Sequence, residues 1–412
     1  MSFTFSTALS GLRASSNSLS VAGNNIANAN TTAFKSSSIT FADIYLGSIG
    51  ARFNGAGVPV QIGNGVSVAS VNRDFSQGNL SSSNSPTNLA IEGNGYFVVK
   101  DSAGVQSYTR AGDFILDKDG FLVTPSGQQV QGYAAVNGVV PPDAALTTLQ
   151  VPIGETIAPR LTSEATLRMN LNAADANGTQ FNATVQVFDS LGRSHNLNLV
   201  FTKTADLSYS VTATLDGNAA QTTPNPADLQ FDANGNLTMP AAPATLSIMP
   251  DQAQLNGATL PSIDLNLYEA DGTANITNFA TASSVSSTTQ DGFPAGAISG
   301  LITDKTGTLI AVFNNGQTRP IGQIALATFN SQDGLQALSN NLFSETSSSG
   351  PPSIGRPSSG GRGNVVGNAL EQSNVDIATE FTNLIIAQRS FQANSRVITT
   401  VNQTLQDLLQ II

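Results

Sequence analysis

A long, uninterrupted helical pattern at the C-terminal end of the chain constrains the fold more than any other feature. Residues 373–412 contain no Gly and no Pro, and their large apolar residues recur at alternating spacings of three and four. Such spacing predicts one long helix with a continuous apolar stripe. The stripe consists of Ile377, Phe381, Leu384, Phe391, Ile398, Leu405, Leu409 and Ile412, with Gln388, Ser395 and Asn402 in the gaps.

The start of this helix and the width of its stripe can also be predicted. Ser373 and Asn374 are candidate N-caps, and Asp376 would lie in the first turn, where the helix dipole favours an anion. Three further apolar residues flank the stripe: Ile385, Val401 and Leu408. The apolar face is therefore wider than the seam of a two-stranded coiled coil, and we expect the helix to need more than one neighbour.

The N-terminal end carries a matching stripe. Its residues follow the same alternation: Phe5, Leu9, Leu12, Leu19 and Ile26, with Ser16 and Gly23 in the gaps. We expect the two terminal helices to lie side by side, with the rest of the chain projecting outward. Because one helix pair buries too little apolar surface to offset its ordering entropy, further burial would come from other copies. The alternative is that both helices pack on the central part of the chain.

Composition limits the classes of partner. The formal net charge is −11 and 11% of residues are charged, so no basic patch for nucleic acid or an anionic membrane is expected. Surfaces poor in charge can pack on one another without desolvating many ions. The chain has no Cys, which excludes disulfides and thiolate chemistry. Its N-terminal residues do not resemble a cleavable secretory signal, and no apolar run is long enough to predict a membrane span.

The pattern of residues in the middle of the chain predicts strands and turns. Residues 65–71 alternate cleanly, and residues 184–188 and 195–201 form a predicted hairpin around 189–192. Pro141–Pro142 marks a boundary, and residues 297–330 return to the strand pattern that precedes it.

These patterns predict a multidomain α+β protein, with the terminal helices paired in an axial coiled-coil domain and two nested mainly-β domains projecting outward. The predicted parts are a helical core domain (1–30 and 364–412), a connector (31–70 and 347–363), an inner β-domain (71–145 and 291–346) and an outer inserted β-domain (146–290). Residues 347–363 are rich in Ser, Gly and Pro, which is typical of a linker.

No catalytic, cofactor or metal site is predicted. Asp117–Gly120 and Asp232–Gly235 resemble fragments of calcium loops, but the twelfth positions are Gln128 and Pro243 rather than Glu, so turns are the better interpretation. His195 has no second His or Cys with which to bind a metal or form a catalytic set.

Two blocks at the ends of the chain resemble a known family. Residues 24–35 are similar to the N-terminal signature of the flagellar rod and hook family, the axial proteins of the bacterial flagellum. Residues 367–376 and 387–392 are similar to its C-terminal signature. The long middle, including 91–97 and 321–327, resembles hook members more than the shorter rod members, and the resemblance is weak through 146–290.

The resemblance implies a structural subunit without enzymatic activity or cofactor. It implies export through the flagellum's type III apparatus without cleavage. Outside the cell, copies would assemble into a curved, flexible tube that transmits torque as a universal joint. The implied partners are other copies, a hook cap protein, a distal rod protein, a hook–filament junction protein, the export gate and a hook-length control protein. Assembly would rest on the two stripes: Leu9, Leu12, Leu19 and Ile26, and Ile377, Phe381, Leu384, Phe391, Ile398, Leu405 and Leu409.

Phe41 and Tyr45 resemble the motif that the export gate reads in this family, a Phe followed four residues later by another apolar residue. The alternative is a small packing contact. Other functions also stay open at this point: a distal rod or junction protein of the same apparatus, a secreted β-rich adhesin, or a secreted glycan-binding or hydrolytic enzyme.

Overall fold

The computed structural model describes residues 2–46, 62–224 and 227–411 and divides the chain into two compact units. Unit 1 holds both chain ends and comprises Met1–Ile153, Gly300–Ala311 and Thr318–Ile412. Unit 2 comprises Gly154–Ser299 and Val312–Gln317. The sequence analysis placed an inserted β-domain at 146–290, within about ten residues of the main segment of unit 2.

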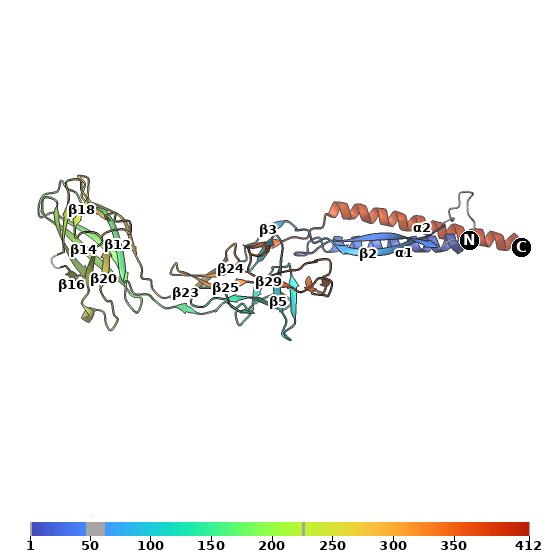
Figure 1. Cartoon of the computed structure of the whole chain (residues 1–412), viewed down its shortest axis with the longest axis horizontal. Helices are drawn as coiled ribbons and strands as arrows, with labels where there is room; N and C mark the ends of the chain where they lie inside the picture. Colours follow the sequence, from blue (N-terminus) through green and yellow to red (C-terminus); the bar gives the residue numbers. More distant parts are fainter. Residues whose placement is uncertain (1, 47–61, 225–226, 412) are drawn as a thin grey trace. The chain divides into compact units, whose positions relative to one another are not determined.

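The two terminal helices contact each other, as the matched stripes predicted. In Figure 1, α1 (Ser2–Ala27) and α2 (Ile377–Ile411) run side by side, and the start of α2 lies near the end of α1. The Asn-rich run ends α1: Asn28 Nδ2 donates to the Asn24 carbonyl at 3.0 Å, and Thr31 Oγ1 donates to Asn28 Oδ1 at 3.0 Å. Side-chain bonds of this kind compete with continuation of the helix.

The N-cap of α2 is Asp376, and the expectation of Ser373 or Asn374 as the cap is wrong. Asp376 Oδ1 accepts a hydrogen bond from the backbone N–H of Thr379 at 2.9 Å. This hydrogen bond lowers the pKa of the Asp376 carboxyl. Asn374 is engaged elsewhere, since its Oδ1 accepts from the Ser36 N–H at 2.8 Å.

A β-hairpin follows α1. Its strands β1 (Ser37–Leu46) and β2 (Ile62–Arg73) pair antiparallel from Ser37 opposite Arg73 to Leu46 opposite Ile62. The alternation at 65–71 correctly predicted a strand. The hairpin packs on α1 where Gly65 leaves room, because a Cβ at this position would lie 2.1 Å from Ser10 Oγ.

The remainder of unit 1 is β-rich. The sheet that contains most of its strands has the order β11 (Thr156–Ile157), β23 (Gly296–Thr303), β24 (Thr308–Phe313), β25 (Thr318–Ile324), β9 (Gln129–Ala134), β5 (Tyr96–Lys100), β6 (Gln106–Thr109), β28 (Leu342–Ser344) and β27 (Gln336–Ala337). Five strands branch from this path: β7 (Ile115–Leu116), β8 (Leu122–Val123), β10 (Leu146–Thr148), β26 (Leu326–Thr328) and β29 (Ser353–Gly355). Phe97 and Phe114 meet edge to face in the core, with ring centroids 5.0 Å apart.

The stretch before α2 is paired into unit 1. Strand β30 (Asn364–Gly367) pairs with β4 (Leu89–Glu92), and β31 (Ala369–Glu371) pairs with β3 (Leu80–Ser82). These two ladders fix the chain on the β-rich part before it enters the C-terminal helix.

Residues 347–363, which composition predicts as a linker, are packed on the sheet instead. Strand β29 pairs with β26, and Ser349 is fully buried. Arg356 stacks over Tyr133, with its guanidinium 5.1 Å from the ring centroid, and donates from Nη1 to Gln323 Oε1 at 2.8 Å. Backbone pairing and arginine contacts of this kind leave no signature in Ser/Gly/Pro content.

Unit 2 has its own sheet and core. Its sheet has the order β13 (Gln180–Phe188), β14 (Ser194–Ala205), β15 (Ser208–Leu215), β16 (Asn218–Thr223), β19 (Thr245–Met249), β20 (Ile263–Asn266), β12 (Glu164–Asn170) and β21 (Ile276–Thr277). Strands β17 (Ala227–Phe231), β18 (Leu237–Met239) and β22 (Ser284–Gln290) branch from it. The unit also contains the short strand β11 (Thr156–Ile157) and a 3₁₀ turn, η1 (Gln252–Gln254). The predicted hairpin is confirmed, with Phe188 opposite Ser194.

Candidate functional site

The helices α1 and α2 approach closely at Gly11 of α1. Small residues are among the buried positions of α1: Ala8, Ala14, Ser15 and Ala22 are buried, and Gly11 is half-buried. A Cβ on Gly11 would lie 2.8 Å from Asn394 Nδ2 of α2, so the two helices approach closely there. Interaxial distance depends on the side chains at the contact, and small residues allow the shortest approach.

The predicted leucine stripe of α1 is only partly covered by its own chain. Leu9, Leu12, Leu19 and Ile26 are all half-buried. The small residues at 8, 11, 15 and 22 follow the same spacing one position earlier, and the sequence analysis missed them because it weighed only large apolar residues.

Only part of the α2 stripe is covered by its own chain. Leu384, Phe391 and Ile398 are half-buried, and Ala387 is buried. By contrast, Ile377, Phe381 and Leu405 keep 47%, 50% and 39% of their surface exposed. The side chain of Leu409 lies outside the described residues.

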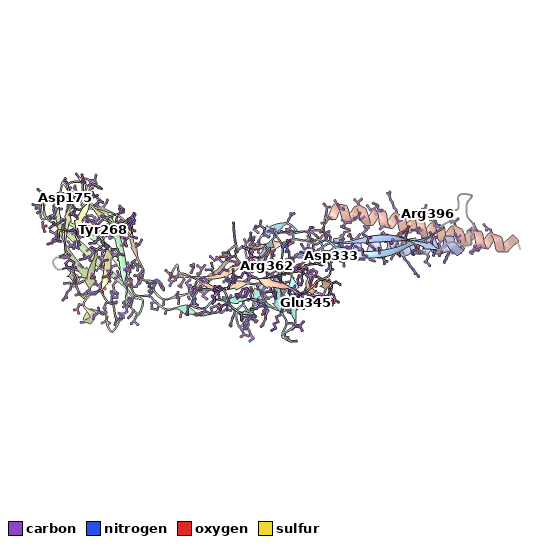
Figure 2. All side chains as sticks on the ribbon, viewed as in Figure 1. Asp175, Tyr268, Asp333, Glu345, Arg362 and Arg396 are labelled. Carbon is purple, nitrogen blue, oxygen red and sulfur yellow. The ribbon has the colours of Figure 1, made fainter. Side chains whose placement is uncertain are left out.

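Further apolar residues of α2 are exposed outside the predicted stripe: Ile385, Ile386 and Val397. Apolar surface therefore continues on both flanks of the side that contacts α1. The charged residues Arg389 and Arg396 are exposed on the remaining face, and Arg396 is labelled on this helix in Figure 2. A contiguous apolar surface rimmed by polar residues is typical of a protein–protein contact.

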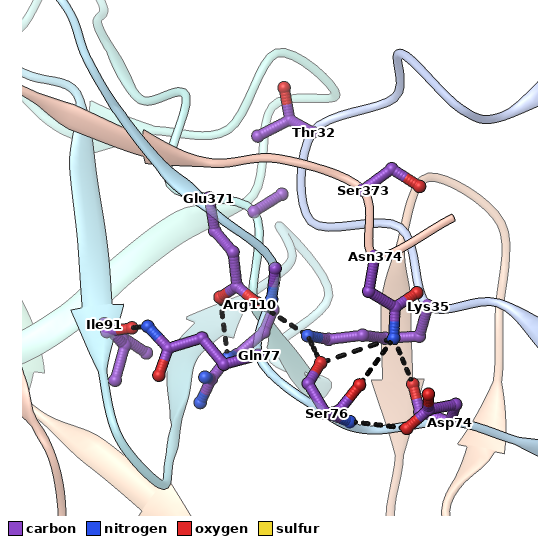
Figure 3. Close-up of polar contacts among 12 residues, drawn as sticks. Thr32, Lys35, Asp74, Ser76, Gln77, Ile91, Arg110, Glu371, Ser373 and Asn374 are labelled. Atoms are coloured by element: carbon purple, nitrogen blue, oxygen red, sulfur yellow. Dashed lines mark hydrogen bonds and ion pairs between the residues drawn. The ribbon is translucent and has the colours of Figure 1, made fainter. Parts of the chain in front are cut away.

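A buried charge cluster joins the helical ends to the β-rich part of unit 1 (Figure 3). The Glu371 carboxylate has 0% of its side chain exposed and accepts from Lys35 Nζ at 2.6 Å and from Arg110 Nε at 3.0 Å. The backbone N–H of Gly78 donates to Glu371 Oε1 at 3.0 Å. Lys35 follows α1, Glu371 precedes α2 and Arg110 follows β6, so one carboxylate ties three segments together. We call Lys35, Arg110 and Glu371 the junction cluster.

Neighbouring backbone groups complete the cluster. Lys35 Nζ also donates to the Ser76 carbonyl at 2.6 Å, and Arg110 Nη1 donates to the Gly95 carbonyl at 2.6 Å. Asn374 Nδ2 donates to the Asp74 carbonyl at 2.9 Å. The segments that enter and leave both helices are thus held by side chains whose polar atoms are paired.

Burial lowers the pKa of Lys35, and the hydrogen bond and charge of Glu371 oppose that shift. Charges removed from water in this way depend on their partner, since loss of one member leaves the other buried and uncompensated. Lys35 and Glu371 lie inside the two blocks that resemble the flagellar family. No spacing in the sequence linked them, because 336 positions separate the two residues.

The two residues compared with an export motif lie on β1. Phe41 is opposite Val68 and has 43% of its surface exposed. Tyr45 is opposite Gly63, and its side chain lies outside the described residues. The structure thus places the pair on an extended strand beside α1.

The acidic loops are turns, as predicted. Asp117 Oδ1 accepts from the N–H groups of Asp119 and Phe121 at 2.9 and 2.8 Å. Asp232 Oδ1 accepts from those of Asn234 and Asn236 at 2.9 and 2.8 Å. Among the described residues, no group of three or more His, Asp or Glu side chains is placed to hold a metal ion. Within the same residues, no helix has the length and apolarity to cross a bilayer.

His195 is held between two carboxylates in unit 2. Its Nδ1 lies 2.7 Å from Asp216 Oδ2, and its Nε2 lies 3.2 Å from Asp189 Oδ2. Burial alone would lower the pKa of His195, but hydrogen bonds and charge from Asp216 and Asp189 raise it. The imidazole of His195 thus links the turn that contains Asp189 to the turn that contains Asp216.

Family models match four parts of the chain. Residues 5–35 match "Flagella basal body rod protein", and residues 366–411 match "Flagellar basal body rod FlgEFG protein C-terminal". Residues 90–156 match "Flagellar hook protein FlgE/F/G D1 domain", and residues 159–293 match "Flagellar basal body protein FlaE D2 domain". The helical ends and both β-rich parts therefore each have a counterpart.

Relatives match over almost their whole length. The chain is 33% identical to the flagellar hook protein FlgE of Escherichia coli (strain K12), covering 99% of both chains. It is 32% identical to that of Borreliella burgdorferi, covering 98% of both chains. A crystal structure of Helicobacter pylori flagellar hook protein FlgE2 has a similar fold, with a TM-score of 0.50 at 15% identity, over 71% of this chain and 100% of that one.

Proposed function

We propose, from the premise that this chain belongs to the flagellar hook protein family, that its copies form a tube with α1 and α2 inside and the β-rich units outside. The chain is a structural subunit of the flagellar hook. In the proposed mechanism the tube is curved, transmits torque from rod to filament, and bends as its outer units shift against those of neighbouring copies.

The observation that carries this proposal is the incomplete burial of the helical ends. Half or nearly half of the surface of Phe381 and Ile377 is exposed, although they belong to the longest apolar stripe in the chain. Full burial of such a side chain contributes about 1.5–3 kcal/mol. Neighbouring copies that cover these residues would supply that free energy on assembly.

The junction cluster would give the assembled tube its mechanical continuity. It holds the ends of both helices to the β-rich part of unit 1 through Lys35, Glu371 and Arg110. Since the cluster is buried, water and salt screen it little. We propose that torque passes between the helices and the sheet through this connection.

Unit 2 would face outward and contact its counterparts in other copies. Support comes from its closed apolar core and from a chain with only 11% charged residues, whose surfaces can slide past one another without breaking many ion pairs. These contacts would set the curvature and rigidity of the tube rather than its existence.

Further partners and the export route follow from family likeness. We propose export through the flagellar type III apparatus, followed by assembly beneath a hook cap between a distal rod protein and a hook–filament junction protein. A hook-length control protein would act on the same pathway. Phe41 and Tyr45 would be read by the export gate, so Phe41→Ala with Tyr45→Ala should lower secretion while purified protein still polymerises. If this double variant is secreted normally, the export gate does not read Phe41 and Tyr45, and their role is in packing.

Electron microscopy of the purified protein tests the proposed function. Salts excluded from protein surfaces, such as sulfate and phosphate, strengthen apolar burial and should drive assembly. We expect tubes to appear as the salt concentration rises. Closed oligomers of fixed size, or monomer at every concentration, would contradict the proposal.

A further inference from the structure

One buried imidazole joins two turns of unit 2. The side chain of His195, at the start of β14, is 9% exposed, and its two ring nitrogens face two different carboxylates. Asp189 belongs to the turn 189–193 between β13 and β14, and Asp216 belongs to the turn 215–218 between β15 and β16. We call these the first turn and the second turn. Because a neutral imidazole carries one N–H, only the protonated ring can donate to both carboxylates.

The two carboxylates differ in how well they tolerate the loss of that proton. The Asp189 side chain is 0% exposed, and its Oδ1 already accepts from the N–H groups of Leu191 and Arg193 at 2.9 Å each. The Asp216 side chain is 46% exposed, so water can solvate it. An ionised carboxylate that is buried without a donor is far more costly than one in water. The one N–H of a neutral His195 therefore belongs on Nε2, which faces Asp189.

The first turn is packed on both ends of the segment 154–299. A Cβ on Gly192 would lie 2.8 Å from Pro159 Cβ and 3.2 Å from the backbone nitrogen of Ala295. Ser190 fixes the turn to a third place, because its N–H donates to the Thr259 carbonyl at 3.0 Å. These contacts do not involve the imidazole, so they hold the first turn whatever the charge of His195.

The second turn depends more on the imidazole. Asp216 Oδ1 accepts from the Asn196 N–H at 2.8 Å, and its Oδ2 lies 2.7 Å from His195 Nδ1. A Cβ on Gly217 would meet none of the described atoms within 4 Å, so no described segment packs against the turn there. The protonated imidazole is therefore the group that connects the second turn to the first.

We propose that His195 is a pH-sensitive link, which couples the second turn to the first only while the imidazole is protonated. Loss of the proton leaves the bond from Nε2–H to Asp189 and removes the bond to Asp216. Unit 2 then becomes more mobile at the second turn, where β16 begins, while the first turn keeps its packing. The proposal concerns unit 2 alone and does not depend on whether copies form tubes.

The charges that act on His195 are these two carboxylates. Burial lowers the pKa of His195, but the hydrogen bonds and charges of Asp216 and Asp189 outweigh burial and raise it. Strands β13, β15 and β16 contain no charged residue. The other charged residues near the first turn are exposed or paired with each other: Arg193, Arg160 and Asp291. The link is therefore intact below pH 6.5 and is lost as the pH rises through the raised pKa.

The tautomer of His195 tests the proposal directly. The chain has a single His, so isotopically labelled histidine reports one imidazole in the NMR spectrum of the full-length monomer. We expect both ring nitrogens to be protonated at about pH 5.5 and the Nε2–H tautomer to predominate at about pH 9. A predominant Nδ1–H tautomer at the higher pH, or an equal mixture of the two, would overturn the proposal.

Hydrogen exchange locates the change within unit 2. The Asn196 amide donates to Asp216, and the Leu191 amide donates to Asp189. After correction for the intrinsic pH dependence of exchange, the protection of Asn196 should fall about tenfold between the two pH values, because the carboxylate loses a charged hydrogen bond. The protection of Leu191 should stay the same. Equal changes at both amides, or none at Asn196, would contradict the proposal.

A pair of matched variants separates the link from a general effect of pH. Asp216→Asn keeps the shape of the side chain and removes its charge, so the protection of Asn196 should no longer depend on pH and His195 should lose its proton at a lower pH. Asp206 is exposed in the turn at the other end of β14 and β15, and Asp206→Asn should leave both readouts unchanged. Full pH dependence in Asp216→Asn, or its loss in Asp206→Asn, would show that the link is not made by Asp216.

Discussion

Strand β14 of unit 2 and helix α2 of unit 1 are both amphipathic, yet they differ in how completely their own chain buries them. In β14 the burial alternates along the strand, and Leu197, Leu199 and Phe201 are wholly buried. In α2, Ala387 is the one fully buried residue among 377–407. Unit 2 buries a large apolar core within a single chain, whereas the long stripe of α2 is left mostly uncovered by its own chain.

This difference indicates where the free energy of assembly comes from. Unit 2 has already buried most of its large apolar residues when the monomer folds, although Leu191, Met239 and Phe279 are exposed, so we expect assembly to add less burial there. The helices keep exposed Ile377, Phe381, Ile385 and other apolar residues that neighbours can bury. Changes to the helical stripe should therefore affect assembly strongly, and changes to unit 2 should affect it weakly.

The largest effect is expected from Phe391→Asp. Phe391 lies in the stripe of α2, and a carboxylate there would be buried without a partner. We expect electron microscopy to show no tubes. Thr400→Asp adds the same charge on the exposed face near Arg396 and should still polymerise. If Phe391→Asp still formed tubes, burial of the α2 stripe would not be required for assembly, and α2 would not differ from unit 2 in this respect.

The junction cluster should be the next most sensitive place. Glu371→Gln leaves Lys35 and Arg110 buried without their carboxylate, and such a change costs about 3–5 kcal/mol. We expect a lower urea midpoint for unit 1 and new trypsin cleavage after Lys35, whose side chain is buried in the unmodified protein. Glu92→Gln removes an exposed carboxylate from β4 and should leave both readouts unchanged. Unchanged stability of Glu371→Gln would refute the role given to the cluster.

Removal of most of unit 2 should have a smaller effect on assembly. Thr156 pairs with Ala297, so the two ends of the segment 154–299 lie side by side and a short Gly/Ser linker can join them. Loop closure costs little for such a linker. We expect tubes of altered curvature or rigidity by electron microscopy. If the shortened chain keeps a folded sheet in unit 1 but forms no tubes, unit 2 contributes more to assembly than we infer.

The smallest effect is expected from the pH dependence of unit 2. The pKa of His195 is raised in the folded protein, so its pairing with Asp189 and Asp216 contributes stability in full below the unfolded value of 6.5. That contribution is lost as the pH rises through the folded pKa. The urea midpoint of unit 2 should fall across this interval, and His195→Gln should remove the dependence. His195 is the single His of the chain, and an equal pH dependence in the variant would exclude it as the cause.

Periodicity predicted what is local or repeated in this fold. The two helices, the strand at 65–71 and the hairpin around 189–192 were all visible in the spacing of apolar residues. The junction cluster was not, because Lys35 and Glu371 come together only through the pairing of β3 with β31 and β4 with β30. Residues 347–363 were misjudged because composition does not reveal backbone pairing. The predicted N-cap of α2 was wrong because Asn374 Oδ1 accepts from the N–H of Ser36, so Asp376 caps the helix instead.

Hydrogen exchange measured in the monomer and in the polymer tests the central claim most directly. We expect the amides of α2 to exchange at least tenfold more slowly in the polymer, because neighbouring copies cover the helix, and those of β14 to exchange at the same rate in both states. Equal protection of the α2 amides in monomer and polymer would contradict the account, because neighbouring copies would then not cover this helix.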